Sequence, residues 1–110
     1  MRCRPIQTKA MMTMRPEAKL EKYFIGKAEA NGFIQYKFIS GVTGVPDRIL
    51  IGNNKIVFVE LKAVNGRLSD RQKFVGNMLR KNGAKVFVPY DEKDIDDIFK
   101  FMKQEKTASI

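Results

Sequence analysis

The sequence contains no histidine and a single cysteine, Cys3. A chain without histidine has no His-based acid or base, no Ser-His or Cys-His nucleophilic pair and no His-ligated zinc. One cysteine forms neither an internal disulfide nor a multi-cysteine zinc site, and it is consistent with a reducing compartment. Carboxylates and lysines therefore remain as the obvious ionisable groups that can carry chemistry.

Long apolar stretches are also missing. No segment approaches the roughly eighteen residues that a membrane span requires, and no signal-peptide core is visible. The length of 110 residues is that of one domain. We expect a soluble, intracellular protein with a flexible basic N-terminal tail at residues 1–14 and a single folded domain at residues 15–110.

Acidic residues are scarce over most of the chain. Lysine and arginine together number 21 against 12 aspartates and glutamates, which gives a net charge of +9. Residues 91–110 hold six acids and four bases, leaving 17 bases and six acids in residues 1–90. A strongly basic body of this kind favours a polyanionic partner such as nucleic acid.

Residues that start and end helices and turns predict seven helices and strands in this sequence. Pro16 suits a first helical turn, Ser69 is a good N-cap, and Asn-Gly pairs end both of the first two helices. The expected elements are a helix over 16–31, strands over 33–39, 48–51 and 55–59, a helix over 69–82, a strand over 84–88 and a helix over 94–102. The order α-β-β-β-α-β-α predicts an α/β fold with a mixed central sheet, because a crossover helix places the fourth strand parallel to the third. The apolar run 56–59 predicts a strand covered on both faces.

Two short motifs flank the central hairpin, Pro46-Asp47 before it and Glu60-Leu61-Lys62 after it. If the turn is centred on Asn53 and Asn54, the numbers of paired residues sum to 107, and Asp47 lies opposite Glu60. Opposed residues have Cβ atoms about 5 Å apart, so the two carboxylates repel each other unless a cation lies between them. Lys62 points to the same strand face as Glu60.

This arrangement resembles the PD-(D/E)xK nucleases, and more narrowly their virus-type replication-repair branch, the VRR-NUC domains, of the stand-alone phage or prophage type. The resemblance covers residues 15 to 103 and implies a restriction-endonuclease-like core. The residues that carry it are Lys37-Phe38, Ser40, the block Gly44-Val45-Pro46-Asp47-Arg48-Ile49, Val59-Glu60-Leu61-Lys62, Leu68-Ser69 and Gln72.

The resemblance implies metal-dependent hydrolysis of a DNA phosphodiester. Asp47 and Glu60 would hold one or two Mg²⁺ or Mn²⁺ ions, with the Leu61 carbonyl and a helical acid, Glu21, as further ligands. Lys62 would act as a general base or by electrostatic stabilisation, and Gln72 would orient Lys62 or a water molecule. Glu17 lies one helical turn before Glu21 on the same face, so the choice between them stays open; the spacing to the glycine that ends the helix in related resolvase-like enzymes favours Glu21.

The implied partner is branched DNA, such as a four-way (Holliday) junction, cut by a homodimer in a bacterial cytoplasm, with no membrane partner and no small-molecule cofactor. Apolar residues of the last helix (Phe99, Phe101 and Met102) are candidates for the dimer interface. The proposed nucleic-acid contacts are Lys37, Ser40, Arg48, Arg67, Arg71 and Lys73. The alternatives are a catalytically silent DNA-binding module and a nuclease acting on flaps or on RNA.

Overall fold

A computed structural model describes residues 16–62 and 66–105. The elements are, in chain order, α2 (Pro16–Ala30), β1 (Ile34–Lys37), β2 (Arg48–Gly52), β3 (Lys55–Val59), α3 (Asp70–Lys81), β4 (Val86–Phe87) and α4 (Glu92–Lys103). The predicted order is therefore confirmed. The predicted tail at 1–14, which includes Cys3, lies outside the described residues.

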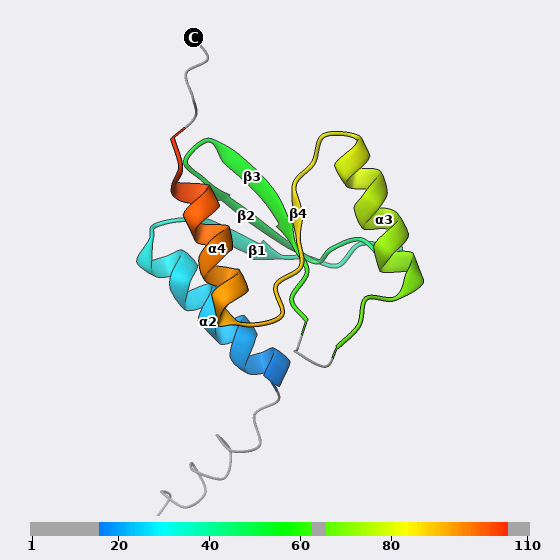
Figure 1. Ribbon diagram of the computed structural model, residues 1–110, viewed down its shortest axis with the longest axis horizontal. Coiled ribbons are helices and arrows are strands. Elements are labelled where there is room, and N and C mark those ends of the chain that lie inside the picture. Colours follow the sequence, from blue (N-terminus) through cyan, green and yellow to red (C-terminus); the bar gives the residue numbers. More distant parts are fainter. Residues whose placement is uncertain (1–15, 63–65, 106–110) are drawn as a thin grey trace, which may run out of the picture.

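The four strands form one mixed sheet in the order β1-β2-β3-β4. The first three strands are antiparallel neighbours, and β4 pairs parallel to β3, as the crossover through α3 predicts. In Figure 1, α2 and α4 lie together at one side of the sheet, whereas α3 stands apart from them beside β4. None of the helices within the described ranges is both long and apolar enough to cross a membrane.

The hairpin between β2 and β3 has the register that the sequence predicts. Asn53 and Asn54 both have positive φ angles, 49° and 62°, which is the geometry of a type I′ turn. The pairs run from Gly52–Lys55 to Arg48–Val59, so paired numbers sum to 107. The Asn53 amide also donates to the Met102 carbonyl at 2.9 Å, which ties the tip of the hairpin to the end of α4.

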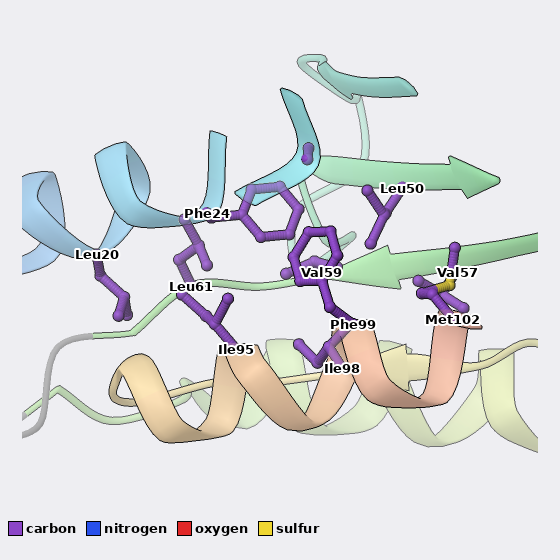
Figure 2. Packing of buried hydrophobic residues seen from close by; sticks show 11 residues of the cluster. Leu20, Phe24, Leu50, Val57, Val59, Leu61, Ile95, Ile98, Phe99 and Met102 are labelled. Carbon is purple, nitrogen blue, oxygen red and sulfur yellow. The ribbon is translucent and has the colours of Figure 1, made fainter. Parts of the chain in front are cut away.

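The hydrophobic core lies between the sheet and the pair α2–α4. Figure 2 shows side chains of both helices meeting those of β2 and β3, with Phe24 of α2 and Phe99 of α4 at the centre. Their ring centroids are 5.8 Å apart. The expectation that Phe99, Phe101 and Met102 form an external interface is therefore wrong for Phe99 and Met102, which are fully buried, and Phe101 packs partly buried against Phe87.

Several boundaries and the burial of one strand differ from the prediction: β1 and β4 are shorter than the predicted strands at 33–39 and 84–88. Helix α4 begins two residues earlier than expected, because the Asp91 side chain caps it by accepting from the Asp94 N–H at 2.8 Å. Strand β3 is not covered on both faces, since the Ile56 side chain is 62% exposed. An apolar run does not by itself distinguish a strand between two layers from a strand with one open face.

Candidate active site

The carboxylates of Asp47 and Glu60 come from adjacent strands at the same end of the hairpin. Asp47 directly precedes β2 and Glu60 directly follows β3, one step beyond the pair Arg48–Val59. Neighbouring strands fix both backbones: Phe38 N–H donates to the Asp47 carbonyl, and Glu60 N–H donates to the Phe87 carbonyl, each at 2.9 Å. The predicted juxtaposition of the two acids therefore follows from the sheet itself.

The surroundings of Glu60 make its carboxyl a weaker acid than a free glutamate, because they raise its pKa. Burial raises the pKa of the Glu60 carboxyl, and the negative charges of Asp47 and, further down, Glu17 raise it again. The Lys62 ammonium and a hydrogen bond from the Asp47 backbone N–H act in the opposite direction but do not cancel the effect. Asp47 and Glu17 together thus outweigh Lys62 in their electrostatic effect on Glu60, and a cation bound between the carboxylates would offset this repulsion.

Gln72 of α3 holds Glu60 from the other side. Its amide Nε2 donates to the Glu60 carboxylate at 3.2 Å, while its Oε1 accepts from the Ser69 N–H at 2.9 Å. The Ser69 hydroxyl in turn accepts from the Gln72 N–H at 3.0 Å, which completes a capping box at the start of α3. Because the oxygen of the amide is used by the cap, its nitrogen faces Glu60. Gln72 thus contacts Glu60, and its expected role in orienting Lys62 or a water molecule stays a prediction.

Glu21 of α2 is engaged by two basic side chains. Its carboxylate accepts from the guanidinium of Arg48 and forms an ion pair with Lys37 at 3.6 Å. Arg48 also donates to the Gln35 side-chain oxygen at 2.9 Å and is only 3% exposed. Sequence reasoning missed Gln35, although its place two residues before Lys37 on β1 puts both side chains on one face.

The burial of Arg48 departs from its predicted role as a phosphate contact. A phosphate contact requires a guanidinium that reaches solvent, whereas Arg48 lies in the interior and its donors are directed at Glu21 and Gln35. Burial of a charged side chain is tolerated when it is paired. Arg48 is paired with the half-buried Glu21 and therefore helps to position that carboxylate at the pocket.

A pocket of about 380 Å³ opens beside Asp47. It is lined by Pro16, Glu17, Ala18, Glu21, Lys37, Asp47, Arg48 and Leu61. Both helical acids thus reach the same cavity as Asp47, and Glu17 is close enough to influence the pKa of Glu60. Glu60 lines a second, smaller pocket of about 140 Å³ against α3, together with Gln72 and Lys73.

The remaining predicted nucleic-acid contacts lie on the loop before β2 and in or just before α3, and of these Lys73 lines the smaller pocket. The Ser40 hydroxyl accepts from the Val42 N–H at 2.9 Å, and Arg71 donates to the Thr43 carbonyl at 3.3 Å. Arg67 and Lys73 are exposed. Gly44 has a φ of +97°, and a Cβ at this position would lie 2.7 Å from the Arg71 carbonyl oxygen, so the loop requires glycine there.

The donor set fits a hard divalent cation held by two carboxylates. Within residues 16–62 and 66–105, no three acidic, histidine or cysteine side chains gather closely enough to form a metal cage on their own. Mg²⁺ does not need such a cage, because it is usually held by one or two carboxylates, with water and substrate phosphates completing its shell. Asp47 and Glu60 supply such a pair.

Comparisons with known proteins identify the family of this chain. The model of the VRR-NUC domain family matches residues 9–90. The chain belongs to the VRR-NUC family. A solved structure described as a VRR_NUC domain is 30% identical, has a TM-score of 0.72, and aligns over 79% of this chain and 97% of its own. No match was found among curated proteins. This VRR-NUC chain therefore carries a nuclease-type domain with a four-stranded mixed sheet flanked by helices.

Proposed function

We propose that this VRR-NUC domain is a metal-dependent, structure-selective DNA endonuclease that resolves four-way junctions as a homodimer. The observation that carries the proposal is the opposition of Asp47 and Glu60, whose repulsion a bound cation would offset. Mg²⁺ or Mn²⁺ is the cofactor that this donor set favours.

Asp47 and Glu60 would hold the metal, which when bound polarises a phosphoryl oxygen and lowers the pKa of a water molecule. Gln72 fixes the Glu60 carboxylate through the hydrogen bond at 3.2 Å, so that carboxylate keeps one orientation. The Leu61 carbonyl and Glu21 are further candidate ligands, and Glu17 is the alternative on α2. The ion pairs of Glu21 with Arg48 and Lys37 support a positioning role for that carboxylate as much as direct ligation.

Lys62 lies two residues after Glu60, a spacing that places the two side chains on the same face of an extended chain. Its charge lowers the pKa of Glu60, which means that Lys62 interacts favourably with the ionised acid. This favourable interaction supports a role for Lys62 in stabilising the negative charge that develops at the phosphate, and general-base catalysis is the alternative role. Arg67, Arg71 and Lys73 are available to bind the DNA backbone near the pockets, since phosphate contacts position a duplex without reading its sequence.

The test is cleavage of labelled four-way junction, flap, duplex and single-stranded DNA in Mg²⁺, Mn²⁺ or EDTA. Wild type is compared with Asp47→Asn and Lys62→Ala. We expect metal-dependent cutting that both substitutions abolish, and paired, symmetric nicks in the junction. Binding of DNA without cutting under every metal would show instead a silent DNA-binding module.

A further inference from the structure

Helix α3 contains a glycine that neither its backbone nor its packing requires. Gly76 lies in the interior of α3, where glycine destabilises a helix relative to alanine. Beyond the helix backbone and the two neighbouring residues, the nearest described atom to a Cβ at this position would be Arg80 Nη1, at 3.6 Å. That distance is an ordinary van der Waals contact. The missing side chain of Gly76 therefore leaves space and relieves no clash.

This space belongs to the pocket of about 140 Å³ against α3, which we call the α3 pocket. Gly76 is buried in its wall, and Glu60 of the carboxylate pair lines the same pocket. Apolar side chains and two polar ones complete most of the wall: Pro46, Leu68, Val86, Val88, Asn77 and Arg80. The α3 pocket therefore adjoins the place at which a phosphodiester would be cut.

The size and the lining of the α3 pocket indicate the kind of group that it admits. An apolar cavity of about 150 Å³ holds one benzene ring, so a pocket of about 140 Å³ has room for one six-membered ring but not for a purine or a base pair. Ligand pockets of proteins are mostly apolar with a few polar groups that fix orientation. A phosphate fits this lining poorly, because it would lose hydration against the apolar walls and lie beside the Glu60 carboxylate. A pyrimidine base has the required ring and a polar edge.

Arg80 and Asn77 offer the contacts that such a base needs. Arg80 Nη2 donates to the Val86 carbonyl at 2.8 Å, and Arg80 Nη1 donates to Asn77 Oδ1 at 3.4 Å. Both bonds lie at the edge of the guanidinium, whereas nucleic-acid bases stack on its planar faces. Because Asn77 uses its oxygen in this bond, its amide nitrogen is the group that can donate to a carbonyl oxygen of a pyrimidine.

We propose that the α3 pocket binds an unpaired pyrimidine base of the DNA, next to the phosphate that the carboxylate pair addresses. The proposal rests on the proposed function in that DNA is the partner. A base enters such a pocket only after it leaves the base stack, and this costs least where the base is already unpaired. Branched DNA supplies bases of this kind more readily than a continuous duplex does. The α3 pocket would therefore contribute to structure-selective cleavage.

The experiment measures binding of labelled duplexes by fluorescence anisotropy in EDTA, which prevents metal-dependent cutting. The duplexes are identical except for one bulged position, which carries thymine, adenine or an abasic site. We expect the protein to bind the thymine bulge about 10-fold more tightly than the abasic bulge, because a stacked and buried base adds this much affinity or more. Adenine should gain little, since a purine is too large for the pocket. Stacking on an open protein surface would instead favour adenine, because the larger ring system covers more area.

Gly76→Ala tests the pocket, and Gly26→Ala is its matched control. Both substitutions replace a glycine of a helix, and a Cβ at Gly26 of α2 would meet no described atom within 4 Å beyond its own helix backbone and sequence neighbours. Alanine favours the helix, so both variants should unfold at the same temperature as wild type or higher. In Gly76→Ala the methyl group takes up part of the α3 pocket, and the thymine preference should fall to about two-fold or less. Gly26→Ala should keep the preference of wild type.

Three results would overturn the α3 pocket. Two of them need no variant: equal affinities of wild type for the thymine and abasic bulges, or tighter binding of adenine than of thymine. The third is a thymine preference that Gly76→Ala retains in full. The nuclease is judged separately, by cleavage in Mg²⁺ or Mn²⁺. A thymine preference in a protein that cuts no DNA would support the pocket and refute the nuclease, whereas cutting without any base preference would refute the pocket alone.

Discussion

Replacement of Gln72 by methionine tests how the active-site carboxylate is held. Gln72 makes two side-chain hydrogen bonds, one from its Nε2 to Glu60 and one to its Oε1 from the Ser69 N–H. Methionine has nearly the same length and a good helix propensity, but it offers neither bond. The substitution therefore removes the support of Glu60 and half of the capping box.

Ser69→Ala is the matched control, because it removes the other half of the capping box and leaves the contact between Gln72 and Glu60 in place. Loss of an N-cap hydroxyl costs about 1 kcal/mol of stability. We expect similar losses of thermal stability in the two variants without metal. Groups that orient a metal ligand contribute about 10- to 100-fold to metal affinity. Gln72→Met should therefore bind Mn²⁺ about 10-fold more weakly, and Ser69→Ala within roughly two-fold of wild type.

The assay is calorimetric titration of the DNA-free protein with Mn²⁺, together with thermal unfolding of both variants. Equal Mn²⁺ affinities of Gln72→Met and Ser69→Ala would refute the reasoning, because they would show that the hydrogen bond to Glu60 has no part in metal binding. If both variants lost Mn²⁺ affinity in proportion to their loss of thermal stability, this would also show that the hydrogen bond to Glu60 has no specific part in metal binding.

Three further predictions concern the surroundings of the site. Arg48→Met should lower the free energy of unfolding by about 1–3 kcal/mol in urea titrations, because it removes the hydrogen bonds of Arg48 to Glu21 and Gln35, whereas the partly exposed Glu21 keeps its ion pair with Lys37; a neutral effect would show that these bonds add nothing. Gly44→Ala should cost about 1–3 kcal/mol, since alanine is strained at a φ of +97° and its Cβ would meet the first turn of α3; unchanged stability would show that the loop moves freely. Glu60→Gln should stabilise the metal-free protein above pH 7. The folded state raises the pKa of Glu60 above its ordinary 4.5, so ionisation of Glu60 at neutral pH disfavours folding, and glutamine removes this cost. The gain in stability should vanish near pH 4, where the Glu60 carboxyl is protonated in the folded protein. A stabilisation of the same size at pH 4 would rule out ionisation as the cause.

Local chemistry explains what could be predicted from the sequence. Asn53 and Asn54 prefer the left-handed conformations of a type I′ turn, and that turn fixes the register that places Asp47 opposite Glu60. Ser69 and Gln72 have the spacing of a capping box, so the start of α3 is also encoded locally.

Tertiary placement explains what could not be predicted. The sequence does not show that Arg48 faces inward, because an arginine at a strand end is usually solvated; only the approach of α2 brings Glu21 to it. Nor does it show that α2 and α4 share one face of the sheet. That arrangement buries Phe99 and Met102 and leaves Ile56 exposed, the reverse of the expectation for each.

Helix α4 is part of the folded unit of this chain but lies outside the segment that matches the family. The match to the VRR-NUC family ends at residue 90, yet Ile95, Ile98, Phe99 and Met102 of α4 lie in the core (Figure 2). Burial of one such side chain contributes about 1.5–3 kcal/mol, so the four together contribute roughly 6–12 kcal/mol, as much as the whole stability of a typical domain. A polypeptide that stops at residue 90 would carry every proposed catalytic residue and still not fold. During synthesis, likewise, the nuclease site would form only after the last helix has left the ribosome.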